Sequence, residues 1–408
     1  MTTTEPVDDL GYDPVAASAL IAGDFRDPYP DLAACRAATP IQVGDFMADV
    51  PRDPDGPDVF TIYSNELVSQ VLRDNHHFSS QVYAEMMGPV MGHSILEMDE
   101  PEHRLHRALV SQAFRHKALA RWEEELVGLV CDSLIDRFVD AGRVDLVRAY
   151  TFPFPVQVIA RILGLPREDY PKFQRWSIEL ISVGWDWDRG VAASNSLRDY
   201  FKDVVDQRRR EPQDDLISDL VCAGVDGNQL TDEELFAFLR LLLPAGAETT
   251  YRSSSSLLFC LLSNPDQLDA VRNDRSLLPQ AIEEGIRYEP PLLFIARSAV
   301  ADVELGGMQI PAGSAIAVCI GAANRDPARF KDPDRFDIFR DAQQHISFGF
   351  GPHMCLGMHL ARMETRVALN RLLDRLPNLR LDPEADDPHV HGLMFRSPKA
   401  LPVLFDPA

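Results

Sequence analysis

The pattern of apolar and polar positions predicts a mainly helical chain with small β-sheets. Between residues 101 and 290, apolar side chains recur every three to four positions, which is the period of an amphipathic helix. Helices are expected over 121–140, 154–164, 167–183, 192–211, 277–289 and 356–375. Short alternating runs predict a hairpin of 41–48 with 58–62, and further strands at 298–304 and 314–320.

One predicted helix differs from the others because it is apolar on all sides. Thr231 followed by Glu234 forms a capping box, and the helical pattern continues from there to about Ser263. Residues 235–247 are almost wholly apolar, so this helix should pass through the protein interior.

The middle of this long helix contains two residues that weaken helices. Pro244 removes a backbone hydrogen bond and clashes with the carbonyl group of Arg240. Gly246 follows two residues later. A buried helix that tolerates both is expected to be distorted at its middle.

The length of 408 residues would ordinarily favour two or more domains. No linker or repeat supports a division, because the stretches richest in proline and glycine, 51–57 and 380–388, look like surface loops. With 45% hydrophobic residues the chain can bury a large core. We expect a single domain over residues 1–408.

The charge balance excludes some classes of partner. With 63 acidic and 40 basic residues the net charge is −23, which opposes binding to nucleic acid or to an anionic membrane surface. The N-terminus has neither an apolar run nor a basic segment, and no stretch is long and apolar enough to span a membrane. Six scattered cysteines without CxxC pairs are typical of a reducing cytosol. The protein is expected to be soluble and cytoplasmic.

A glycine-rich loop, FGFGPHMCLG over 348–357, precedes the last predicted helix. Cys355 lies where unpaired backbone N–H groups and the helix dipole stabilise a thiolate. Gly349 and Gly351 permit close approach of the backbone to a flat ligand, and Gly357 keeps the first helical turn slim. The loop therefore predicts a thiolate beneath a planar group.

Other uses of this cysteine find less support in the sequence. A lone cysteine is ordinarily a small buried hydrophobic residue. A zinc site with His353 lacks a second pair of ligands nearby, and a nucleophilic cysteine lacks a local base and oxyanion hole.

The loop resembles, at every fixed position, the haem-binding signature FGxGxHxCxG of the cytochrome P-450 family. The resemblance implies haem b with Cys355 as the iron's thiolate ligand, and a haem pocket that includes Phe348, Gly349, His353 and Gly357. It also implies the family fold, a triangular prism with a long central helix over the haem.

Two further segments resemble motifs of the same family. Glu284 and Arg287 match the ExxR motif, in which positions i and i+3 share a helix face and can pair. Arg335, in the segment PDRF, is implied to complete a buried Glu–Arg–Arg network. This network would be structural.

The segment AGAETT at 245–250 resembles the oxygen-activation motif of the family. By this resemblance Gly246 gives dioxygen room against the helix, Thr249 hydrogen-bonds the distal oxygen, and Glu248 relays protons from solvent. The alternative is that the threonines bond to carbonyl groups one turn back and that Glu248 lies on a solvated face.

Three cationic side chains and His353 are implied to hold the haem propionates. His103 and Arg107 lie one helical turn apart and match the HxxxR element, and Arg297 matches another propionate-binding arginine. His106 is expected to face elsewhere. Each residue alone would be read as an ordinary surface charge.

The family layout also implies an apolar substrate pocket. Its predicted lining consists of Met86, Met87, Met91, Leu242, Leu292, Leu293, Phe294, Ile295, Met394 and Phe395. For any one of them core packing is an equal alternative. A small hydrophobic substrate is expected.

The resemblance therefore implies a haem-thiolate monooxygenase that inserts one atom of dioxygen into its substrate by hydroxylation or epoxidation. A peroxide-dependent enzyme or a haem sensor would not need the relay of Glu248 and Thr249. No redox domain is recognised in the chain, so electrons are expected from NAD(P)H through a separate ferredoxin and ferredoxin reductase. The predicted docking face carries the basic residues Arg104, Arg115, His116, Lys117, Arg362 and Arg366.

Overall fold

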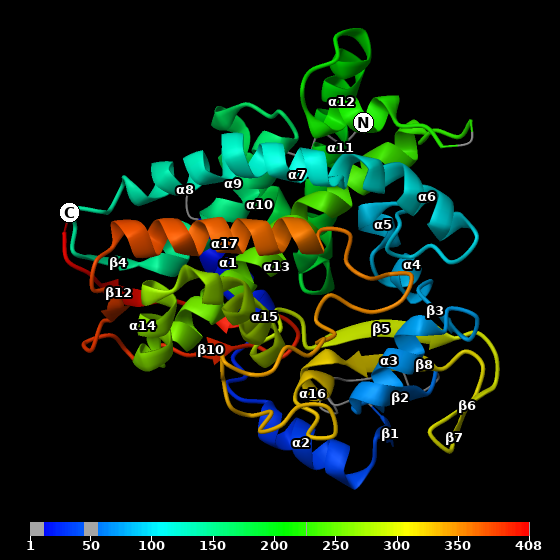
Figure 1. Ribbon diagram of the computed structural model, residues 1–408. Helices are drawn as coiled ribbons and strands as arrows, with labels where there is room; N and C mark the ends of the chain where they lie inside the picture. Colours follow the sequence, from blue (N-terminus) through cyan, green and yellow to red (C-terminus); the bar gives the residue numbers. More distant parts are fainter. Residues whose placement is uncertain (1–11, 45–55, 226, 408) are drawn as a thin grey trace.

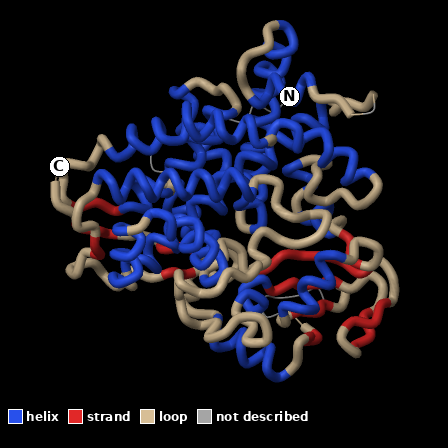
Figure 2. Tube along the Cα trace, viewed as in Figure 1, coloured by secondary structure: helices blue, strands red, loops and turns tan. Residues whose placement is uncertain are grey.

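Helices make up most of the computed structural model, which describes residues 12–44, 56–225 and 227–407 (Figure 1). The longer helices gather on one side of the molecule and the largest sheet lies on the other (Figure 2). The α-helices are α1 (Pro14–Ala22), α2 (Tyr29–Ala38), α3 (Asn65–Arg73), α4 (Val82–Met86), α5 (Gly88–Met91), α6 (Glu102–Ser111), α7 (His116–Trp122), α8 (Gly128–Ile135), α9 (Pro153–Ile162), α10 (Tyr170–Ile181), α11 (Trp187–Arg210), α12 (Leu216–Cys222), α13 (Asp232–Leu262), α14 (Pro265–Asn273), α15 (Leu278–Tyr288), α16 (Ile320–Asn324) and α17 (Met358–Arg375). Among the described helices, none is long and apolar enough to cross a bilayer.

Twelve short strands are found in the described ranges. They are β1 (Ile41–Val43), β2 (Val59–Ile62), β3 (Phe78–Ser79), β4 (Arg143–Asp145), β5 (Phe294–Ala299), β6 (Val303–Leu305), β7 (Met308–Ile310), β8 (Ala315–Cys319), β9 (Arg380–Leu381), β10 (Val390–His391), β11 (Ser397–Pro398) and β12 (Pro402–Leu404). The largest sheet has the order β1-β2-β8-β5-β3, in which β2 and β8 are parallel and the other pairs antiparallel. The predicted fold class, mainly α with small sheets, is confirmed.

The long central helix, α13, begins as the sequence predicts. The Thr231 hydroxyl accepts a hydrogen bond from the backbone N–H of Glu234, and the Glu234 carboxylate accepts one from the backbone N–H of Thr231 at 2.7 Å. The helix continues past Pro244 to Leu262 without a break. After its exposed first turn, the helix is buried as predicted apart from a few positions, most of them near its middle.

Two of the predicted elements differ from those observed. The helix expected over 121–140 is α7 and α8 joined by a π-helical turn at Glu123–Val127, because apolar spacing alone does not distinguish a π turn from an α turn. The single strand expected at 298–304 is divided between the end of β5, which starts earlier because Phe294 pairs with Cys319 of β8, and the beginning of β6. The hairpin of β1 with β2 is observed, while residues 45–48 of its predicted first strand and 51–55 of the predicted loop lie outside the described residues.

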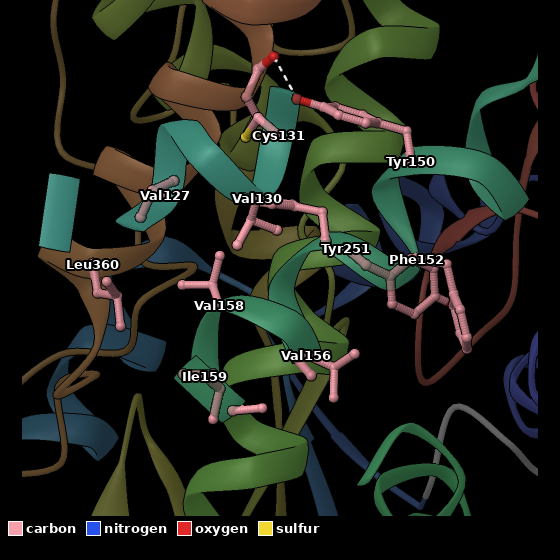
Figure 3. Packing of buried hydrophobic residues seen from close by; sticks show 14 of the residues in the cluster. Val127, Val130, Cys131, Tyr150, Phe152, Val156, Val158, Ile159, Tyr251 and Leu360 are labelled. Carbon is pink, nitrogen blue, oxygen red and sulfur yellow. Dashed lines mark hydrogen bonds between the residues drawn. The ribbon is translucent and has the colours of Figure 1, made fainter. Parts of the chain in front are cut away.

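The main hydrophobic core lies between the long helices (Figure 3). Val130 of α8, Val158 of α9 and Leu360 of α17 belong to it and are buried. Tyr150 reaches across this core, and its hydroxyl donates a hydrogen bond to the carbonyl oxygen of Ala368 at 2.9 Å. A second core cluster fills the space beside the five-stranded sheet.

Candidate functional site

The cysteine loop is fixed by backbone hydrogen bonds just before α17. The N–H of Cys355 donates to the carbonyl oxygen of Phe348 at 2.7 Å, and that of Gly349 donates to Ile346 at 2.9 Å. Gly349 and Gly351 have φ values of 73° and 74°, in the left-handed region that favours glycine. The loop therefore has a defined shape that holds the thiol at its end.

The environment of the Cys355 thiol indicates an interior hollow. Cys355 is accessible at its surface, yet burial raises the pKa of its thiol, while the backbone N–H of Gly357 and the charges of Arg107 and Arg362 act to lower that pKa. A side chain that is accessible and still surrounded by protein faces a cavity. The thiol is thus open to a ligand inside the molecule.

The middle of α13 also exposes a strip of small residues. Ala245 is exposed and Thr249 is half-buried within an otherwise buried helix. The Thr249 hydroxyl donates to the carbonyl oxygen of Ala245 at 2.8 Å, which is the backbone bond that the alternative interpretation expected. Because the hydroxyl is the donor in this bond, the Oγ1 atom of Thr249 can still accept a hydrogen bond.

The role predicted for Gly246 is wrong. A Cβ atom at this position would lie 2.9 Å from Cδ1 of Ile159, so the position points toward α9. Gly246 allows close packing of α13 on α9, and Ala245 is the small residue on the accessible strip.

Glu248 does not lie on a solvated face. Its side chain is buried and accepts hydrogen bonds from Nε of Arg252 at 3.0 Å and from the Ser18 hydroxyl at 3.3 Å. Ser18 also lies 2.7 Å from the Tyr251 hydroxyl. Burial raises the pKa of Glu248, and the charge and hydrogen bonds of Arg252 and Ser18 oppose this. No sequence pattern pointed to Ser18, which lies 230 residues away along the chain.

Four basic side chains predicted to bind propionates are brought together. The rings of His103 and His353 are 4.0 Å apart at their centroids, and Arg107 donates to the carbonyl oxygen of Met354. Burial, followed by the positive charges of His103, Arg297 and Arg107, lowers the pKa of His353 to about 3. Basic side chains gathered in this way are suited to hold a negatively charged group.

These residues fit a group that carries two carboxylates. Within the described ranges no carboxylate lies within 4 Å of Arg107 or Arg297, and the buried Nε2 of His103 has no hydrogen-bond partner. Haem propionates would supply both the charge and the missing acceptor. His106, as predicted, faces elsewhere and lies 2.8 Å from the Glu234 carboxylate.

The predicted ion network exists, with one different member. Arg287 donates to both oxygens of Glu284 at 2.7 and 2.8 Å, and both side chains are buried. Arg340 is the third member, with its Nε 3.3 Å from each oxygen. The prediction for Arg335 is wrong, because its side chain is exposed and only its carbonyl oxygen accepts bonds from the other two arginines.

The predicted substrate wall is corrected at two positions. The surface of a hollow is accessible, so residues with almost no exposed area do not line it. Leu293 is 0% exposed and packs in a core cluster beside α2, and Met91 is 2% exposed and belongs to the main core. Of the other predicted residues, Leu242 and Phe294 keep little accessible surface, and the rest keep more: Met86, Met87, Leu292, Ile295, Met394 and Phe395.

Comparison with known proteins agrees with this geometry. The family model for cytochrome P450 matches residues 155–401. PikC, a cytochrome P450 monooxygenase of Streptomyces venezuelae, is 35% identical over 98% of this chain and 95% of its own length. The steroid C26-monooxygenase of Mycolicibacterium smegmatis is 37% identical over 88% of this chain and 90% of its own length.

Solved structures show the same fold. CYP109E1 from Bacillus megaterium, in complex with testosterone, superposes with a TM-score of 0.84 at 32% identity, over 93% of this chain and 99% of that one. The thiol in its hollow, the basic cluster and these likenesses lead to one conclusion: the chain belongs to the cytochrome P450 family and is a haem-dependent monooxygenase.

Proposed function

We propose that this enzyme inserts one atom of dioxygen into a small hydrophobic molecule, by hydroxylation or epoxidation. When bound, the haem iron supplies the reductive activation of dioxygen. The observation that carries the proposal is the pairing of Thr249, on the accessible strip of α13, with the buried carboxyl group of Glu248 next to it.

Cys355 would hold the iron, because its thiol is accessible within the hollow. His103, Arg107, Arg297 and His353 would hold the two propionates, since they form a basic cluster in which neither arginine has a carboxylate within 4 Å among the described residues. Phe348, Gly349 and Gly357 would shape the surface of the loop that faces the macrocycle.

Glu248 and Thr249 would manage protons at the reacting oxygen. Burial raises the pKa of Glu248, so its carboxyl group holds a proton at a higher pH than an exposed carboxyl group would. The Thr249 hydroxyl donates a hydrogen bond to the carbonyl oxygen of Ala245, so its oxygen can accept a hydrogen bond from a group in the hollow. A haem sensor or a peroxide-dependent enzyme would have no use for this pair.

The test is the ratio of product formed to NADH oxidised. Thr249→Ala and Glu248→Gln should each continue to consume NADH but divert it to hydrogen peroxide. Loss of a positioned proton donor typically costs roughly 10²- to 10⁴-fold in the step it serves, so the ratio should fall at least severalfold. An unchanged ratio in both variants contradicts the proposed relay.

Accessible apolar side chains at the positions predicted for the pocket support a hydrophobic substrate. Met86, Met87 and Met394 add flexible surface that adapts to different ligand shapes. Relatives named as steroid monooxygenases, and the testosterone complex of CYP109E1, make steroids the first class to test. Displacement of the iron's axial water shifts the Soret band, so titration with testosterone and with a polar control such as glucose separates a hydrophobic pocket from a polar one.

We further propose that electrons come from NAD(P)H through a separate ferredoxin and its reductase. Arg115, His116 and Lys117 are exposed at the start of α7, which packs against α17, the helix that follows Cys355. They form a local positive surface on a chain with a net charge of −23.

A further inference from the structure

The carboxyl group of Glu248 is closed to solvent on the side of α1. Ser18, Arg252 and Tyr251 surround it there, and all three are buried and bonded to one another or to Glu248. These hydrogen bonds fix the carboxyl group on the α1 side, where side chains and not solvent surround it.

A small cavity lies against Glu248, between α9, α10 and α13. Its volume is about 10 Å³, close to the space that a single water molecule needs. Glu248, Ser177 and Gln174 are among its lining residues. The Ser177 hydroxyl is buried and has no hydrogen-bond partner in the part of the chain that the structure describes. A water molecule in this cavity would give the Ser177 hydroxyl a hydrogen-bond partner.

A larger surface cleft begins where this cavity ends. It lies between α8, α9 and α10 and has a volume of about 290 Å³. Val156 and Gln174 line both spaces, so these two side chains alone are common to the cleft and the cavity. Val156 can neither carry a proton nor bind water, whereas the side-chain amide of Gln174 can bind water.

We propose that protons reach Glu248 from this cleft, through one water molecule held by Ser177, with Gln174 placed between the two spaces. In each cycle the internal water passes a proton to the Glu248 carboxylate and takes one from water in the cleft, so that proton number is conserved. Ser177 and Gln174 are positioning residues in this account. The inference rests on the relay role proposed for Glu248.

Infrared spectroscopy of the ferric holoenzyme tests the route without turnover. The C=O band of protonated Glu248, identified by its loss in Glu248→Gln, shifts when its proton is replaced by deuterium. Ser177→Val fills the cavity, and Gln174→Leu removes the amide between the spaces. After mixing with D₂O each variant should exchange slower by on the order of tenfold or more, as expected when a proton path is blocked.

Two matched variants serve as controls. Gln157→Leu makes the same chemical change at a residue that lines the cleft but not the inner cavity. Ser177→Ala removes the hydroxyl but leaves space for the water. Both should exchange within about threefold of wild type, since water can still reach the carboxyl group. The ferrous carbonyl spectrum reports whether each variant is folded.

The outcomes separate this route from the relay itself. Exchange as fast as wild type in a folded Ser177→Val or Gln174→Leu variant overturns the route. If Glu248→Gln nevertheless lowers the ratio of product to NADH, the relay stands and only its connection to the cleft is wrong. If Glu248→Gln leaves that ratio unchanged, the proposed function of Glu248 fails, whatever the exchange rates.

Discussion

At the scale of single residues, the carboxylate of Glu284 shows how a buried charge is made tolerable. It accepts hydrogen bonds from Arg287, from Arg340 and from the backbone N–H of Asp337 at 2.9 Å. The Arg287 guanidinium also donates to the carbonyl oxygens of Asn324 and Pro333. The network thus ties α15 to the loop that precedes the cysteine segment.

Replacing the arginines tests the corrected membership of this network. Arg340→Ala removes a charged donor from Glu284 and should lower the free energy of unfolding by about 1–3 kcal/mol. Arg335→Ala, with an exposed side chain, should change it by no more than about 0.5 kcal/mol. Urea denaturation of the two variants gives the comparison. Equal losses would mean that Arg340 has no special place in the network.

At the scale of elements, the cysteine loop depends on its contact with the end of α3. A Cβ atom on Gly351 would lie 2.4 Å from the carbonyl oxygen of Leu72, whereas one on Gly349 would meet nothing closer than 3.6 Å. The close approach that glycine allows at Gly351 is therefore to a neighbouring helix. Both glycines have positive φ, so the backbone conformation favours glycine at both positions.

The two glycines should respond differently to alanine. Each substitution carries the strain of a left-handed backbone, of order 1–3 kcal/mol. Gly351→Ala adds a clash with backbone atoms that cannot move aside, so it should also reduce haem content, read as the absorbance ratio of the Soret band to the protein band. Haem retention by Gly351→Ala equal to that of Gly349→Ala would show that the contact with α3 does not position the loop.

Prediction from sequence succeeded where the signal is local. The capping box of Thr231 and Glu234 is observed because both partners lie within one helical turn. Prediction failed where the path of a loop decides which side chain reaches the site. Arg335 and Arg340 lie in the same irregular segment between α16 and α17, and only the fold shows which of them turns toward Glu284.

The same limit explains the substrate wall. Residues 292–295 read as one apolar run, but the fold buries them unequally: Leu293 enters a core cluster, while Leu292, which forms an isolated bridge with Phe395, keeps accessible surface. No sequence pattern predicts the long-range partners of Glu248, above all Ser18. The Cys355 loop, in contrast, was recognisable because its ten residues are contiguous.

At the scale of the whole molecule, charge decides where an acidic partner can dock. Three residues of the predicted docking face already pair with carboxylates: Arg362 with Glu283 at 2.6 and 2.7 Å, Arg366 with Glu123 at 2.5 Å, and Arg104 with Glu100 at 3.7 Å. Arg115 is exposed and has no carboxylate within 4 Å among the described residues. The free positive charge therefore lies at the start of α7.

Charge reversal at this position tests the docking surface. Arg115→Glu should slow the reduction of the iron by ferredoxin severalfold at low ionic strength, and the difference should shrink as salt screens the charges. Arg380→Glu, an equal change of charge on the distant strand β9, should have little effect. Stopped-flow rates at two salt concentrations provide the comparison, and equal rates for the two variants would place the docking surface elsewhere.

The most direct test of the whole account is the identity of the iron's thiolate ligand. Of the six cysteines, Cys355 and Cys222 are exposed, so Cys222→Ser is the matched control for Cys355→Ser. The ferrous carbonyl form of a haem-thiolate protein has a red-shifted Soret band. The account predicts that Cys355→Ser loses this band and that Cys222→Ser keeps it; a Cys355→Ser variant that retains the band would contradict the assignment of the site.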